Sequence, residues 1–193
     1  MSNMKDALGR TIDYMRISIT DRCNLRCKYC MPYGVECVPR WDILSLEEIQ
    51  AVGICAAGLG IRHIKVTGGE PLVRRDCCQL VKLLKSIPGI EKVTITTNGV
   101  LLDRYLEPLL EAGIDGINIS LDTLDPCMYE KITGFDRLAY VMKTIERSPG
   151  LPVRVKINAV SIDFSSMDGE GCSGPGGSWW KELVELTGRY PVD

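Results

Sequence analysis

The chain lacks several features that mark particular classes of protein. It has a single histidine, His63, so a zinc site built on several imidazole groups has no support. No apolar run reaches about eighteen residues and no apolar h-region follows the N-terminus, which argues against a membrane span and a signal peptide. A net charge of −2 over 193 residues argues against a nucleic-acid-binding surface. We therefore expect a cytoplasmic protein without membrane or nucleic-acid partners.

The nine cysteines include one compact group. Cys23, Cys27 and Cys30 lie within eight residues, with no histidine nearby and no fourth cysteine at comparable spacing. The group is flanked by basic residues, namely Arg22, Arg26 and Lys28. We expect these positive charges to lower the pKa values of the thiols. Such a group favours metal binding or redox chemistry.

Short β-rich segments alternate with helical patterns. We predict strands at 15–20, 63–69, 92–99, 116–122 and 153–162, and helices at 44–60, 76–87, 101–112 and within 126–147. The strands are nearly continuous apolar or β-branched runs, which is typical of parallel strands covered on both faces. Strand–helix units at this spacing predict βαβ crossovers and an α/β fold.

Glycine-rich and polar motifs follow the predicted strands. They are the cysteine loop, TGGEP at 67–71, TTNG at 96–99 and SLD at 120–122. The C-terminal ends of parallel strands meet at one edge of a sheet or barrel, where ligand sites collect. The motifs therefore predict one shared site.

The pattern changes after residue 162. Residues 163–178 contain five glycines and no hydrophobic periodicity, which indicates a Gly/Ser-rich linker. An amphipathic helix follows within 179–193. The chain therefore divides into a core at 1–162, a linker at 163–178 and a helical segment at 179–193.

Three thiolates suit an iron–sulfur cluster better than zinc. A structural zinc site needs four ligands, and the candidates for a fourth are Cys37, six residues beyond the group, and His63, within a strand. A 4Fe–4S cubane on three cysteines instead leaves one iron open to an external ligand. A non-catalytic metal-binding module is the alternative.

Cys23-x3-Cys27-x2-Cys30, with Tyr29 before the last cysteine, resembles the signature of radical S-adenosylmethionine (SAM) enzymes. Over nearly all of residues 8–162 the chain is also similar to one family among them, the MoaA family of GTP 3′,8-cyclases. The motifs that carry this resemblance are RISITDRCNLRCKYCMP, IKVTGGEPLVRRD, TITTNGVLL, INISLDTLDP, ITGFDR and VKINAV. The resemblance implies a TIM-type (β/α) barrel, incomplete here after about five strands.

The resemblance also implies a cofactor site. Cys23, Cys27 and Cys30 would hold one N-terminal 4Fe–4S cluster. The residues that would bind SAM are Tyr29, Gly68, Gly69, Glu70 and Ser120. At the two glycines a close approach of backbone to ligand would leave no room for a Cβ atom.

Four further residues match GTP-binding positions of the family: Arg16, Lys65, Thr96 and Lys156. Arg16 and Lys156 match a basic pair that meets the triphosphate, a role suited to guanidinium and ammonium groups. Lys65 stands where the family usually has arginine, so it keeps the charge and loses the bidentate geometry.

The implied reaction is that of a radical SAM lyase in molybdenum cofactor biosynthesis. An adenosyl radical removes the ribose 3′ hydrogen of GTP, and the resulting carbon radical attacks C8 of guanine. The expected partners are GTP, an external electron donor and a second copy of the chain. Another radical SAM reaction, such as peptide modification, is the enzymatic alternative.

The family's C-terminal region, with its second 4Fe–4S cluster, has no counterpart in the sequence. We therefore expect a chain that binds the first cluster but does not cyclise GTP unaided. We also expect the outer edge of the strand at 153–162 to lack a partner, which is an association risk.

Overall fold

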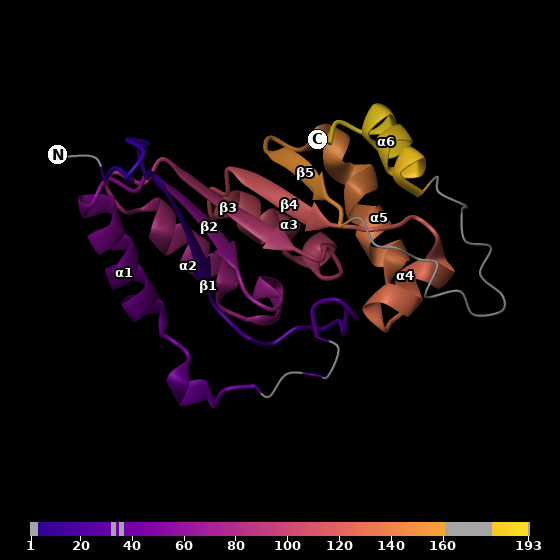
Figure 1. Ribbon diagram of the computed structural model, residues 1–193, viewed down its shortest axis with the longest axis horizontal. Coiled ribbons are helices and arrows are strands. Elements are labelled where there is room, and N and C mark those ends of the chain that lie inside the picture. Colours follow the sequence, from indigo (N-terminus) through magenta and orange to yellow (C-terminus); the bar gives the residue numbers. More distant parts are fainter. Residues whose placement is uncertain (1–3, 32–33, 35–36, 161–178, 193) are drawn as a thin grey trace.

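The computed structural model describes residues 4–31, 34, 37–160 and 179–192. Five parallel strands form one sheet in sequence order, from indigo β1 to orange β5 in Figure 1. The strands are β1 Tyr14–Ser18, β2 His63–Thr67, β3 Lys92–Thr97, β4 Gly116–Ser120 and β5 Arg154–Asn158. The α-helices are α1 Leu46–Gly58, α2 Cys77–Lys85, α3 Leu102–Glu111, α4 Pro126–Thr133, α5 Leu138–Arg147 and α6 Trp179–Arg189. The predicted parallel α/β fold is confirmed.

The boundaries of the elements differ from the prediction in one consistent way. Each strand ends two to four residues earlier than predicted, and the residues that follow turn into the loops of the C-terminal edge. The helical stretch within 126–147 is two helices, because Gly134 takes φ +80° and ends α4. The predicted linker at 163–178 lies outside the described residues.

The ends of the helices follow from short-range hydrogen bonds. Ser45 Oγ accepts from the Glu48 backbone N–H at 3.2 Å, and Glu48 Oε2 accepts from the Ser45 N–H at 2.8 Å, which forms a capping box at the start of α1. Asp125 caps α4 in a similar way by accepting from the Met128 N–H at 2.7 Å. None of the helices in the described ranges has the length and apolar character that crossing a membrane requires.

The two faces of the sheet differ in chemistry. Alternate residues of each strand point to opposite faces. One face is apolar and packs against the helices in a single core, which includes Ile64, Val66, Val93, Ile95, Ile117, Ile119, Leu80, Leu106, Leu109, Val141 and Ile145. The opposite face carries polar side chains, among them Arg16, Lys65, Thr96, Asn118 and Lys156. The expectation of strands covered on both faces is therefore wrong for the described residues, because the polar face lines a cavity.

The helix α6 and the residues after it cover the edge of β5. Leu183 and Leu186 of α6 are buried in the core. Val192, which follows α6 (Figure 1), forms a parallel bridge with Val155 of β5. The expectation that this edge has no partner is wrong at Val155. Val192 lies where a strand next to β5 would run.

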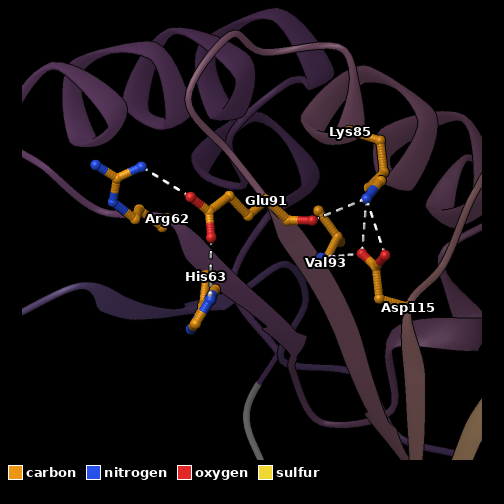
Figure 2. Close-up of polar contacts among 6 residues, drawn as sticks. All are labelled: Arg62, His63, Lys85, Glu91, Val93 and Asp115. Atoms are coloured by element: carbon orange, nitrogen blue, oxygen red, sulfur yellow. Dashed lines mark hydrogen bonds and ion pairs between the residues drawn. The ribbon is translucent and has the colours of Figure 1, made fainter.

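The N-terminal ends of β2, β3 and β4 are joined by charged side chains (Figure 2). Lys85 Nζ lies 3.0 and 2.8 Å from the two carboxylate oxygens of Asp115, and Asp115 Oδ2 accepts from the Val93 N–H at 2.6 Å. Arg62 pairs with Glu91 at 2.8 Å, and His63 Nε2 lies 3.9 Å from the same carboxylate. This end of the sheet lies opposite the ligand edge, so these contacts stabilise the fold.

Replacement of Asp115 tests that role. Asp115→Ala leaves the Val93 N–H without its acceptor and removes the carboxylate partner of the Lys85 ammonium, which keeps its bond to Glu91 O at 3.1 Å. We expect the free energy of unfolding to fall by about 2 kcal/mol, measured by urea denaturation. Asp136→Ala, at an exposed carboxylate, is the matched control and should change stability by less than about 0.5 kcal/mol. Equal stabilities for the two variants would contradict the assignment.

Candidate active site

A cavity of about 440 Å³ opens at the C-terminal edge of the sheet. Every residue predicted for the site lines it except Lys156. Those that do are Arg16, Cys23, Cys27, Tyr29, Cys30, Lys65, Gly68, Gly69, Glu70, Thr96 and Ser120. The fold therefore brings together residues spread over more than a hundred positions. Lys156 is exposed on β5, next to Asn118 of β4, outside this lining.

The loop with the three cysteines is held by backbone hydrogen bonds. The N–H groups of Cys30 and Met31 both donate to the carbonyl of Cys27, at 3.0 and 2.8 Å, which makes a tight turn. On its other side the loop is bound to the end of α4. The Arg26 N–H donates to Thr133 O at 2.8 Å, and the Lys28 N–H donates to Ile132 O at 2.9 Å. The positions of the thiols are thus coupled to α4.

The thiols differ in environment. Cys30 is exposed, while Cys23 and Cys27 are half-buried. Burial raises the pKa of Cys23, and it raises that of Cys27 to about 12 with further contributions from Cys23, Asp122 and Cys30. The net shifts of the Cys23 and Cys27 pKa values are therefore upward, opposite to the expectation from the flanking basic residues. Arg26 has only a minor opposing effect on Cys23, and its guanidinium donates to the Cys23 and Leu25 carbonyls instead.

The two glycines of the GGEP turn pack against the start of the cysteine loop. A Cβ atom on Gly68 would lie 2.7 Å from Thr20 O, and one on Gly69 would lie 2.5 Å from Arg22 O. The Gly69 N–H donates to Thr20 O, and the Glu70 N–H donates to Arg22 O, both at 2.7 Å. Glycine is therefore required at these positions because the backbone of residues 20–22 lies too close for a Cβ atom. The sequence pattern did not reveal this reason.

The Glu70 side chain is buried and fully bonded. Its Oε1 accepts from the Leu72 N–H at 3.0 Å and the Thr97 hydroxyl at 2.7 Å, and its Oε2 accepts from the Asn98 N–H at 2.7 Å. Burial raises the pKa of Glu70, although these three hydrogen bonds oppose that shift. The carboxylate thus joins the loops that follow β2 and β3. The main-chain groups of Glu70 are bonded as well, its N–H to Arg22 O at 2.7 Å and its carbonyl to the Val73 N–H at 3.2 Å.

Two polar residues that the sequence reasoning missed organise the site. Asn98 Nδ2 donates to Asn24 Oδ1 at 2.8 Å and lies 3.8 Å from Cys23 Sγ. Asp122 Oδ2 accepts from the Tyr29 hydroxyl at 2.8 Å, and its Oδ1 accepts from the Val160 N–H at 2.8 Å. Both residues belong to the motifs TTNG and SLD. A polar side chain directly after a buried strand is the signal that could have identified them.

Two basic side chains of the strands line the same cavity. Arg16 of β1 and Lys65 of β2 are neighbours in the sheet register. Lys65 Nζ also lies 5.9 Å from the ring centroid of Tyr14. The structure thus joins Arg16 with Lys65 on adjacent strands, whereas Lys156 is three strands away from Lys65.

The donor set of the cavity fits an iron–sulfur cluster. Its candidate metal ligands are three thiols, which is the chemistry that such clusters use. No three His, Cys, Asp or Glu side chains in the described part of the chain converge to hold a single metal ion. Both proposed fourth zinc ligands lie outside the lining: Cys37 is exposed, and His63 lies at the other end of the sheet.

Comparison with known proteins agrees with this arrangement. The radical SAM superfamily matches residues 17–168. The chain belongs to the radical SAM superfamily. Membership implies a 4Fe–4S cluster and the binding of SAM.

This radical SAM chain is also similar to curated proteins. It is 42% identical to the GTP 3′,8-cyclase of Alkaliphilus oremlandii over 192 residues, which cover 98% of this chain and 57% of that protein. It is 43% identical to molybdenum cofactor biosynthesis protein 1 of Drosophila melanogaster, over 100% of this chain and 32% of that protein. The chain thus spans about half the length, or less, of these curated relatives.

Solved radical SAM structures share the fold. The crystal structure of Streptococcus suis SuiB bound to S-adenosylmethionine matches with a TM-score of 0.74 at 23% identity, over 94% of this chain and 39% of that one. Native anSMEcpe with bound AdoMet matches with a TM-score of 0.68 at 18% identity, over 93% of this chain and 50% of that one. These likenesses confirm a partial TIM-type barrel as the fold class of the radical SAM chain.

Proposed function

We propose that the chain is the cluster-binding and SAM-binding part of a GTP 3′,8-cyclase that acts in molybdenum cofactor biosynthesis. The observation that carries this proposal is the convergence of three thiols, the GGEP turn and two basic side chains on one cavity. The relatives named GTP 3′,8-cyclase support the choice of substrate. A cytoplasmic location, an external electron donor and a homodimer belong to the same proposal.

Cys23, Cys27 and Cys30 would hold one 4Fe–4S cluster. Such a cluster with an open iron supplies the electron that cleaves SAM reductively. The glycine turn and Ser120 would position SAM along the edge of the sheet, next to Tyr29. The hydrogen bond from Tyr29 to Asp122 orients the tyrosine ring at the cavity wall.

The polar face of the sheet would bind the substrate. Arg16 and Lys65 lie side by side and present two positive charges, which suits a triphosphate. Thr96 of β3 lines the same cavity and would donate or accept one hydrogen bond. Lys156 would join this set only if it reaches across from β5. The protein's contribution is to hold the reacting atoms close together and to exclude water.

Anaerobic reconstitution tests the proposal. We expect about four irons per chain and an EPR signal of the reduced protein that changes when SAM is added. Cys27→Ala should lose both, while Cys55→Ala, at an exposed cysteine of α1 outside the cavity, should keep both. Bound zinc without iron would indicate a metal-binding module instead.

The same samples test the extent of the activity. With GTP we expect no cyclic nucleotide from this chain alone, because the sequence has no counterpart of the second cluster site of the family. Formation of the cyclic product would contradict that part of the proposal.

A further inference from the structure

A buried hydroxyl near the thiols has no partner in the structure. Tyr129 of α4 is 3% exposed, and its hydroxyl makes no hydrogen bond. An unpaired buried hydroxyl destabilises a fold, and a phenylalanine would fill the same space without that cost. Buried polar groups in proteins are nearly always bonded, so this one requires an explanation.

The hydroxyl belongs to the wall of a second, small cavity. This cavity, of about 30 Å³, adjoins the candidate active site, and its lining includes Cys27, Tyr29, Ser120, Asp122 and Tyr129. Tyr129 makes no hydrogen bond to Asp122, whose two oxygens accept from Tyr29 and Val160. Burial raises the pKa of Tyr129, and among the charged groups Cys27 adds most to that shift.

The sulfur atoms of the loop differ in their donors. Cys23 Sγ accepts from the Leu25 N–H at 3.4 Å and lies 3.8 Å from Asn98 Nδ2. In the described part of the chain no other residue donates a hydrogen bond to Cys27 Sγ, whose one donor is its own backbone N–H. A sulfur without a donor from another residue and a hydroxyl without an acceptor thus line the same small cavity.

The loop and the helix are also fixed relative to each other. Two backbone hydrogen bonds join Arg26 to Thr133 and Lys28 to Ile132. Gly134, which ends α4, packs against Arg26, where an added Cβ would lie 3.4 Å from the Arg26 Cβ. Cys27 lies between the two bonded loop residues, and Tyr129 lies one helical turn before Thr133. Their separation is therefore set by the fold.

We propose that Tyr129 tunes the cluster by donating a hydrogen bond from its hydroxyl to Cys27 Sγ when that sulfur is a cluster ligand. Hydrogen bonds to the sulfurs are one of the factors that set the potential of an iron–sulfur cluster. A donor stabilises the more negative, reduced cluster. Tyr129 therefore raises the reduction potential and makes the first electron easier to accept. The inference rests on the proposed cluster site.

The test compares Tyr129→Phe with the wild-type chain after anaerobic reconstitution. We expect equal iron content and a more negative midpoint potential in an EPR-monitored redox titration. Tyr140→Phe, at a tyrosine of α5 that is 54% exposed, should keep the wild-type potential. Equal potentials in all three proteins would overturn the inference and leave the cluster site intact. Absence of iron in the wild type would overturn the proposed function as well.

A second measurement needs no cluster. Without iron, Tyr129→Phe should be at least as stable to urea as the wild type, because it removes an unpaired buried hydroxyl. A clearly less stable Tyr129→Phe would mean that the hydroxyl has another partner in the fold. That result would overturn the inference regardless of the potential.

Discussion

Gly69→Ala is expected to abolish the loading of the cluster while leaving a folded protein. The added Cβ would lie 2.5 Å from Arg22 O and 2.7 Å from Asp21 O, which are backbone atoms that cannot rotate away. The cysteine loop must then move, and Cys23 is the next residue. We expect the iron content after anaerobic reconstitution to fall at least about tenfold, because a shift of about 1 Å in a supporting shell is enough to disable a site.

The control is a glycine with free space around it. A Cβ on Gly58, the last residue of α1, meets no atom within 4 Å. Gly58→Ala should load iron as the wild type does and should be at least as stable. Normal iron content in Gly69→Ala would show that the loop can move without losing the cluster. The close approach to Arg22 would then not be what requires glycine at position 69.

Glu70→Ala is expected to give the largest loss of stability. The change leaves the Leu72 N–H, the Thr97 hydroxyl and the Asn98 N–H without acceptors in a buried position. At roughly 1–3 kcal/mol for each unpaired donor, we expect the free energy of unfolding to fall by more than about 3 kcal/mol. Urea denaturation of the protein without its cluster measures this loss separately from any effect on cofactor binding.

Two further variants separate the cause from simple loss of a carboxylate. Glu111→Ala removes an exposed carboxylate at the end of α3 and should change stability by less than about 0.5 kcal/mol. Glu70→Gln keeps the shape and one acceptor oxygen, so its stability should fall between those of the wild type and Glu70→Ala. A Glu70→Ala protein as stable as Glu111→Ala would contradict a structural role for this carboxylate.

Much of the fold could be predicted from local patterns. Alternation of β-rich and helical segments predicted five parallel strands, and the motifs after them predicted the edge that holds the site. The cysteine spacing alone identified the candidate ligands. These features succeed because each depends on residues that are close together in the sequence.

The errors concern interactions between distant segments. Threonine is both β-branched and polar, so the run TITT suggests cover on both faces, and only the family resemblance indicates that Thr96 faces a site, as it does. The charge of Arg26 suggested low thiol pKa values, but burial of Cys27 by the whole fold has the larger effect. The bond of Glu70 to the Asn98 N–H joins residues 28 positions apart, and the sequence did not reveal it. No local pattern reports such pairings.

The carboxylate of Asp122 connects the two ends of the described core. Through Tyr29 it holds the loop after β1, and through Val160 it holds the chain just beyond β5. These segments are far apart in the sequence, and the two bonds join them through one side chain. A displacement of the segment at Val160 would therefore be transmitted to the residue beside Cys30 by a single side chain.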